Sequence, residues 1–458
     1  MGRGTNPENH TGLEVQSGGN SRQGKSDGGY PRSGKVPIAL VDLRSQLSSF
    51  KCLKCREILP PSPPIFNCTK CHGELTLCYN LEEARGLLRD NIRRTLQESI
   101  YRYAPLLPIR DSNNVVTLGE GGTPLVPMTS LGQLIGTPRL LGKDETRNPT
   151  QSFKDRPISV GISVLRELCA TDVACISAGG NTASSVAAYC ARAQIKAHLY
   201  LPSWTPRAKL LHALALGAEV KRIEGADNLS SFNFGMSEMR RKGFLPLMTR
   251  PKINPFPLEG CKTIAYELVE QLKGDAPDWV VIAVGTGTNL AGVWKGFKEL
   301  HDCGLAEQLP RLLATQSNTC MPLVDAFERG LDAEEIVPWP DAHTIASGLN
   351  DAYPDACVTA LQALKDSHGK AISVTDQGIL EAVLLLARQE GLFAEPAGAA
   401  SIAGLIEAIR EGIIKKDDRV VCLITGSGLK QPDALTDFIK VPKPIRGASR
   451  NNSPTFHD

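Results

Sequence analysis

The sequence predicts an α/β protein in which helices cover both faces of a parallel sheet, preceded by a small cysteine module. After residue 170, short apolar runs alternate with helical segments, which is typical of parallel strands joined by crossover helices. Polar, glycine-containing loops follow two of these runs, at 178–182 and 285–289. Because ligands of such sheets bind at the carboxyl ends of the strands, we expect the functional site at these loops.

Composition and charge favour a small-molecule partner. A chain of 458 residues, 41% of them hydrophobic, is long enough for two or three domains. Its 51 basic and 49 acidic residues leave a net charge of +2, which favours neither nucleic acid nor a membrane surface as a partner. No apolar run reaches the ~18 residues of a membrane span, and the N-terminus lacks a secretory core. We therefore expect a cytoplasmic protein whose 13 cysteines are reduced.

The N-terminal region divides into a tail and a cysteine-rich module. Residues 1–36 carry almost no large apolar side chain, so we expect a disordered tail. Residues 45–80 hold two Cys-x-x-Cys pairs separated by twelve residues, a spacing that suits a zinc ribbon. Four thiolates leave no open position, so the metal would be structural. Alternatively these cysteines only fill a small core, and the nearby Cys78 complicates the assignment. The predicted ligands are Cys52, Cys55, Cys68 and Cys71.

The rest of the chain follows in a regular order. Residues 81–118 read as a connecting helix, over 81–97, and an entry segment that leads through a glycine-rich turn into a strand near 126. Later helices are expected at 158–169, 183–193 and 290–300, and strands at 173–177, 196–201, 218–223, 280–284 and 420–424. The last residues, 436–458, are rich in Pro, Arg, Asn and Ser and read as a flexible tail.

Lys154 is the candidate catalytic residue. It lies in the polar run 148–156, between an aromatic residue and an acid–base pair. A lysine becomes a nucleophile at neutral pH when desolvation or a neighbouring cation lowers its pKa, and attachment to an aldehyde cofactor as a Schiff base is the common use of such a lysine. Taken alone, Lys154 also fits an ordinary solvated surface lysine.

Two loops at strand ends are candidate cofactor contacts. The loop 285–289 opens a helix, so its backbone amides and the helix dipole form a plausible phosphate cradle. A third glycine and a P-loop lysine are missing, which favours a mononucleotide-sized phosphate over NAD or ATP. The loop at Thr425 offers a hydroxyl that can hydrogen-bond a neutral ring nitrogen. Each loop also fits an ordinary turn or cap.

Several stretches resemble, in matching order, those of the threonine synthase family, in the tryptophan-synthase-β group of pyridoxal-phosphate (PLP) enzymes. The likeness covers roughly residues 100–435 and includes 148–156, 178–189, 285–297, 395–401 and 425–430. It implies a two-domain fold type II PLP enzyme with parallel and mixed sheets. Its catalytic region would span 119–435, with a smaller domain at roughly 160–250 inserted in the larger. The family also suggests a homodimer, and a four-cysteine module occurs among its members.

The resemblance assigns a role to each matching residue. Lys154 would be the Schiff-base lysine and later the acid–base, with Asn181 beside the phenolic oxygen of PLP. Thr425 would meet the ring nitrogen, and Thr182 would lie near the substrate carboxylate. The phosphate would be held by Gly285, Thr286, Gly287, Thr288 and Asn289.

Departures from the family pattern concern the substrate. The usual Ser-Thr-Gly-Asn reads Ala178-Gly179-Gly180-Asn181, so a substrate-facing hydroxyl is missing. Pro257 replaces the arginine that in the family grips the phosphate of O-phosphohomoserine, and an apolar ring cannot replace that contact. Lys252 or Arg250 could compensate, although nothing in the sequence shows that either does. Gln151 and Pro157 also stand where glycine is usual.

The expected function is a PLP-dependent lyase or synthase acting on a small L-amino acid. If the activity of the family holds, the enzyme converts O-phosphohomoserine and water to threonine and phosphate, a step in amino-acid biosynthesis. The departures keep open a threonine or serine dehydratase, or a β-replacement enzyme that uses another O-activated amino acid. A non-enzyme alternative is a zinc-ribbon interaction protein that has lost activity, although its cofactor residues are all present.

Overall fold

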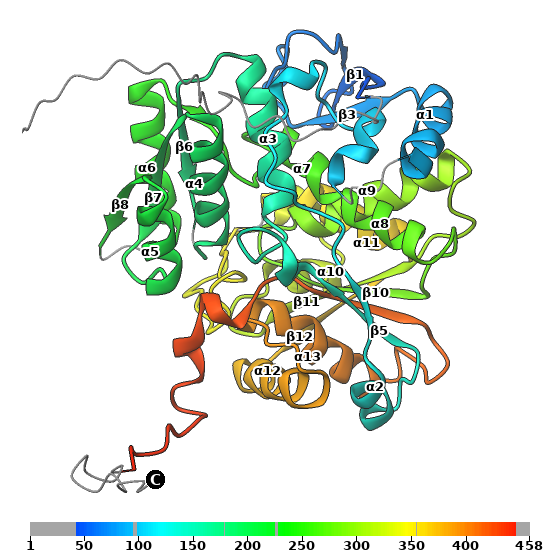
Figure 1. Cartoon of the computed structure of the whole chain (residues 1–458), viewed down its shortest axis with the longest axis vertical. Coiled ribbons are helices and arrows are strands. Elements are labelled where there is room, and N and C mark those ends of the chain that lie inside the picture. Colours follow the sequence, from blue (N-terminus) through cyan, green and yellow to red (C-terminus); the bar gives the residue numbers. More distant parts are fainter. Residues whose placement is uncertain (1–42, 95–98, 178, 225–227, 354, 446–458) are drawn as a thin grey trace, which may run out of the picture. The chain divides into compact units, whose positions relative to one another are not determined.

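The computed structural model describes residues 43–94, 99–177, 179–224, 228–353 and 355–445 (Figure 1). The predicted tail of residues 1–36 lies outside these residues. So does most of the predicted tail 436–458, of which residues 436–445 are described and contain no helix or strand. Three sheets organise the described chain, with six, four and three strands.

The six-stranded sheet forms the larger core. Its strand order is β12-β11-β10-β13-β5-β4, and all neighbours are parallel except β4, which is antiparallel to β5. A parallel sheet with one antiparallel edge strand is common in α/β folds. The strands are β4 (Leu125–Pro127), β5 (Leu140–Asp144), β10 (Trp279–Ala283), β11 (Arg311–Ser317), β12 (Lys370–Val374) and β13 (Val420–Ile424).

Helices cover both faces of this sheet because successive strand residues point to opposite sides. Val280 and Ile282 pack into one apolar core with α8 (Thr263–Gln271), α9 (Thr288–Asp302), α10 (Pro322–Glu328) and α11 (Cys357–Asp366). Val281 and Ala283 face the other core, with α2 (Thr129–Ile135), α12 (Asp376–Glu390) and α13 (Pro396–Arg410). The central strands are therefore buried on both faces, which explains their continuous apolar runs.

The four-stranded sheet has its own core. Its order is β8-β7-β6-β9, with all neighbours parallel. Its apolar residues pack with those of the surrounding helices. Figure 1 shows α4, α5 and α6 beside these strands. The strands are β6 (Asp172–Ile176), β7 (Lys196–Pro202), β8 (Glu219–Ile223) and β9 (Leu245–Pro246). The helices are α3 (Asp155–Glu167), α4 (Asn181–Ala193), α5 (Arg207–Ala215) and α6 (Asn228–Lys242).

The N-terminal module is a three-stranded antiparallel sheet followed by a helix. Its strands, in the order β2-β1-β3, are β1 (Leu47–Cys52), β2 (Ile58–Leu59) and β3 (Leu75–Tyr79), and the helix is α1 (Leu81–Arg94). The Tyr79 hydroxyl donates to Glu259 of α7 (Phe256–Cys261) over 2.8 Å. Lys295 of α9 donates to the Leu77 carbonyl over 2.8 Å. These hydrogen bonds connect the module to α7 and α9.

The sequence-based element assignments hold with small shifts at their ends. The strand predicted at 420–424 has those bounds, and the helix predicted from 183 begins two residues earlier, at Asn181. The α/β fold with two parallel or mixed sheets is confirmed. The boundaries between domains stay a prediction. In the described parts of the chain, no helix is both long enough and apolar enough to cross a membrane.

Candidate active site

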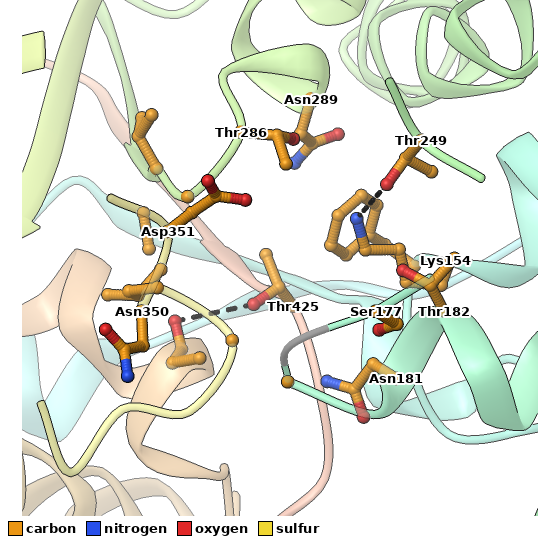
Figure 2. Close-up of a pocket in the computed structure, with 18 of the residues that line it drawn as sticks. Lys154, Ser177, Asn181, Thr182, Thr249, Thr286, Asn289, Asn350, Asp351 and Thr425 are labelled. Carbon is orange, nitrogen blue, oxygen red and sulfur yellow. Dashed lines mark hydrogen bonds between the residues drawn. The ribbon is translucent and has the colours of Figure 1, made fainter. Parts of the chain in front are cut away.

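A cavity with about 810 Å³ of empty space, part of it open to solvent, lies at the carboxyl ends of strands from both larger sheets. Ser177 follows β6, Gly285 follows β10 and Thr425 follows β13, and all three line the cavity. Both loops at which the sequence places the functional site therefore contribute residues to one cavity at strand ends. Figure 2 shows Lys154 on one side of this space, with side chains from both sheets around it.

The backbone before Lys154 is held by hydrogen bonds over several residues. Thr150 donates from its backbone N–H and its hydroxyl to the two carboxylate oxygens of Asp155, each over 2.6 Å. Lys430 donates to the Thr150 carbonyl over 2.6 Å, and the Phe153 N–H donates to the Thr425 carbonyl over 3.0 Å. The lysine thus begins α3 at a fixed distance from the loop that carries Thr425.

A buried ion network lies directly after Lys154. Arg156, which has no exposed surface, donates to Glu145 over 2.7 Å and to Glu267 over 2.6 Å. Lys143 lies 2.7 Å from the same Glu267. Burial alone would raise the pKa of Glu267, but Arg156 and Lys143 hold it below its ordinary value. With each charge paired, the network fixes the start of α3 without leaving a buried charge uncompensated.

The Lys154 amine lines the cavity and has a lowered pKa. Its side chain is half-buried in the cavity wall, and Nζ donates to the Thr249 hydroxyl over 2.8 Å (Figure 2). Burial lowers the pKa of Lys154 to about 8 from the ordinary 10.5. At neutral pH more of this amine is therefore uncharged than of an ordinary lysine, and the uncharged form is the one that acts as a nucleophile or a general base.

The glycine loop 285–289 lies at the N-terminus of α9 and lines the cavity. Gly287 precedes the first helical residue with φ of +88°, a left-handed conformation that glycine adopts without strain. Asn289 is buried, and neither its Nδ2 nor its Oδ1 has a hydrogen-bond partner among the described residues. This amide can therefore donate to and accept from a ligand in the cavity. Together with the helix dipole, the loop suits a phosphate.

A second helix N-terminus, that of α4, borders the same cavity. Asn181 donates to Glu395, whose other oxygen lies 2.9 Å from Lys209. The Asn181 Oδ1 has no partner among the described residues and remains available to a ligand. Thr182 follows it along the cavity wall, at the positive end of the helix dipole. Ala178, one of the departures from the family pattern, lies outside the described residues.

Nearly all predicted site residues meet in this cavity. The exception is Thr288, whose hydroxyl donates to the Thr249 carbonyl over 2.8 Å and so ties the glycine loop to the loop beside Lys154. The Thr425 hydroxyl lies 3.5 Å from the Ala397 carbonyl. The predicted residues that line the cavity are Lys154, Asn181, Thr182, Gly285, Thr286, Gly287, Asn289 and Thr425.

Among the polar residues of the wall that sequence reasoning missed are Thr249, Asn350 and Asp351, and it left Arg250 undecided. Thr249 follows the short strand β9, so the strand-end rule was the signal that could have found it. Asn350 and Asp351 come from a segment without helix or strand, and no pattern marks them. Arg250, one of the two cations considered as compensation, lines the cavity, whereas Lys252 does not.

Three of the departures from the family pattern lie among the described residues. Pro257 is buried in α7, and its ring would lie 3.0 Å from a Cβ placed at Gly161 of α3, so it fills the contact between these helices and does not line the cavity. Pro157 lies in the first turn of α3, where proline is tolerated. Gln151 has φ of +62°, the left-handed conformation in which glycine is favoured.

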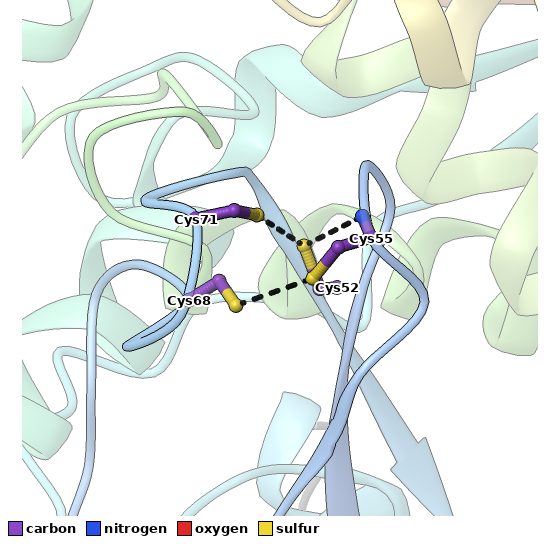
Figure 3. Close-up of side chains that lie close together, drawn as sticks. All are labelled: Cys52, Cys55, Cys68 and Cys71. Atoms are coloured by element: carbon purple, nitrogen blue, oxygen red, sulfur yellow. Dashed lines mark hydrogen bonds between the residues drawn. The ribbon is translucent and has the colours of Figure 1, made fainter.

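The four predicted cysteines of the N-terminal module form a cluster (Figure 3). Their sulfur atoms all lie within 4.8 Å of one another, with Cys52 and Cys71 3.5 Å apart and Cys55 and Cys68 3.7 Å apart. Tetrahedral zinc–thiolate geometry places sulfurs about 3.8 Å apart, so the arrangement suits zinc. Cys78 is not part of the cluster.

Sequence comparisons agree on one family. Residues 116–426 match the family described as "Pyridoxal-phosphate dependent enzyme". The chain is 39% identical to the threonine synthase of Methanocaldococcus jannaschii, over 84% of this chain and 93% of that protein. It is 36% identical to that of Methanosarcina acetivorans, over 86% and 94%, and 39% identical to that of Mycobacterium tuberculosis H37Rv, over 76% and 92%.

Solved structures share the fold. A processed threonine deaminase isoform from Solanum lycopersicum matches with a TM-score of 0.57 and 23% identity, over 69% of this chain and 83% of that one. A diaminopropionate ammonia lyase from Escherichia coli matches with a TM-score of 0.61 and 18% identity, over 70% and 89%.

Proposed function

Since this chain belongs to the family of pyridoxal-phosphate dependent enzymes and is threonine synthase-like, we propose that Lys154 is the residue that holds the cofactor and moves the substrate proton. The single observation that carries the proposal is the position of Lys154. Its amine, with its pKa lowered by burial, faces the same cavity as the phosphate cradle of α9.

The residues of the cavity fit PLP. The unpartnered amide of Asn289 and the helix N-terminus with Gly287 suit its phosphate, and the free Oδ1 of Asn181 suits a group on its ring. The Thr425 hydroxyl is a neutral partner for the ring nitrogen. When bound, PLP supplies an electron sink for the charge left behind by the removed α-proton.

Lys154 performs the proton transfer. In its uncharged form, Nζ accepts the α-proton of the amino acid, and the Thr249 hydroxyl, 2.8 Å away, orients the amine. At pH 7 a lysine with a pKa near 8 is uncharged about one tenth of the time, against on the order of one part in 3,000 for an ordinary lysine. We assign the substrate carboxylate to Thr182 and the α4 N-terminus.

The reaction we propose first is that of the named relatives, in which O-phosphohomoserine and water give threonine and phosphate. A second candidate is a dehydratase or β-replacement reaction on serine, threonine or a relative. It is favoured because Pro257 is buried away from the cavity, and Arg250, the cation that lines it, is already paired with carboxylates.

A panel of amino acids and their phosphate esters separates these reactions. Release of phosphate with formation of threonine from O-phosphohomoserine supports the first, whereas ammonia and a 2-oxo acid from serine or threonine support the second. Turnover of no member of the panel by protein loaded with PLP would contradict both.

We propose that the four-cysteine cluster binds a structural zinc ion, as its spacing and the distances between its sulfurs support. Metal analysis of purified protein should give one zinc per chain, and Cys68→Ser should remove it. We also propose a cytoplasmic homodimer. Thirteen unpaired cysteines favour the reducing compartment, and the dimer rests on the family resemblance.

A further inference from the structure

The N-terminal module contacts the loop that carries Thr249. Asn67, which directly precedes Cys68, is half-buried, and its side-chain amide donates to the Lys252 carbonyl over 2.8 Å. The backbone around the second cysteine pair is closed by a hydrogen bond of its own, in which the Cys68 N–H donates to the Gly73 carbonyl over 3.0 Å. Asn67 therefore projects from the start of a closed turn in the module.

Aromatic packing joins the same two parts of the chain. The rings of Phe50 and Phe66, both in the module, meet the ring of Phe256 edge to face, with centroids 6.0 Å and 6.1 Å apart. Phe256 is buried and begins α7. The module thus contacts the loop 249–255 in its middle, at Lys252, and directly after its end.

The loop between β9 and α7 is itself a closed turn. The N–H groups of Ile253 and Asn254 both donate to the Arg250 carbonyl, each over 2.9 Å. Lys252 lies inside this turn. Because the hydrogen bonds make the turn one unit, a shift of Lys252 also moves Arg250 and its neighbour Thr249.

Thr249 connects this turn to both sides of the proposed PLP site. Its hydroxyl accepts from Lys154 Nζ over 2.8 Å, as Figure 2 shows, and its carbonyl accepts from the Thr288 hydroxyl over 2.8 Å at the start of α9. Among the residues that the structure describes, Thr249 is the one hydrogen-bond partner of Nζ. The direction of the Lys154 amine therefore depends on the position of Thr249.

We propose that Asn67 is a positioning residue for Lys154, which acts through the turn that carries Thr249. The inference rests on the proposed function of Lys154 and gives the N-terminal module a part in that site. A small displacement of a reacting group costs a large factor in rate, so a hydrogen bond outside the cavity can affect attachment of PLP.

A double-variant cycle tests this route. The measured quantity is the rate at which PLP attaches to the full-length protein after its cofactor has been removed, followed by the absorbance band of bound PLP. Asn67→Ala and Thr249→Val should each slow attachment about ten-fold. Because both changes interrupt one route, the double variant should also be about ten-fold slower, whereas independent effects would multiply to about a hundred-fold.

Two further variants make the test specific. Thr69→Ala alters an exposed side chain between the same two cysteines and should attach PLP at the wild-type rate. Asn67→Asp conserves the size of the side chain but removes its N–H donor, so it should slow attachment as Asn67→Ala does. It also repeats the test if the alanine variant does not fold.

Failure of this inference differs from failure of the proposed function. If wild-type protein with added PLP shows no absorbance band, or Lys154→Ala retains the band, the proposed function fails. If the band depends on Lys154 but either single variant attaches PLP at the wild-type rate, the proposed function stands and this inference is overturned. A double variant about a hundred-fold slower, or a Thr69→Ala protein as slow as Asn67→Ala, would also overturn it.

Discussion

Two parts of the cavity wall are built by different means. The glycine loop 285–289 consists of backbone amides and a left-handed glycine at the N-terminus of α9, and it carries no charged side chain. The neighbouring part of the wall carries Arg250 and Asp351, from segments without regular structure. A regular element can hold a cofactor shared by a whole family, whereas irregular segments can change with the substrate.

Lys154 lies across the cavity from Asp351 (Figure 2), and removing it should have the largest effect. We expect Lys154→Ala to lower activity by on the order of a thousand-fold and to abolish the absorbance band of bound PLP, because it removes both attachment and proton transfer. Lys196→Ala, at an exposed lysine on β7, serves as the control and should behave like wild type. An active Lys154→Ala protein would contradict the assignment.

The substitution Gly287→Ala should weaken binding of the PLP phosphate at the loop 285–289 without changing Lys154. The new Cβ would force φ of +88° on an alanine and would lie 3.1 Å from Ala360, which displaces the cradle. We expect PLP to bind roughly ten-fold more weakly, equal to about 1.4 kcal/mol. Gly330→Ala is a matched control, because its φ is +67° and its Cβ would meet no atom within 4 Å.

Both variants should lose about 1 kcal/mol of stability from left-handed strain. Equilibrium dialysis with PLP and chemical unfolding separate the two effects. If Gly330→Ala weakened PLP binding as much as Gly287→Ala, the effect would come from general strain and not from the cradle.

The burial of Lys154 predicts a pH dependence. Because burial lowers the folded-state pKa to about 8, the reactive uncharged amine should reach half of its maximum near pH 8 and level off about one unit higher. Rates of PLP attachment to protein stripped of cofactor, measured from pH 6 to 10, should show this midpoint. A midpoint near the ordinary 10.5 would mean that the amine is solvated.

The smallest effect is expected at the turn before Lys154. Gln151 is exposed and holds φ of +62°, so Gln151→Gly relieves left-handed strain while making the unfolded chain more flexible. We expect a gain of roughly 0.5 kcal/mol in the free energy of unfolding, with unchanged substrate preference. Loss of more than about 1 kcal/mol in chemical unfolding would show that the Gln151 side chain contributes to the turn.

The sequence predicts the loops after β10 and β13 better than it predicts the wall around Arg250 and Asp351. Apolar alternation marks β10 and β13, and the loops after them carry small polar residues, so Asn289 and Thr425 could be found from pattern alone. Asp351 has no such marker, because it meets Arg250 only through tertiary packing of segments 101 residues apart. The ion pairs of Arg156 could not be predicted from the sequence either, because its partners Glu145 and Glu267 come from separate elements.

Attachment of PLP to Lys154 can be measured directly. Reduction of the PLP-loaded protein with borohydride fixes the cofactor to its lysine, and mass spectrometry of the digested protein locates it. We expect the added mass on the peptide that contains Lys154 and on no other peptide. Attachment to any other lysine, or to none, would contradict it.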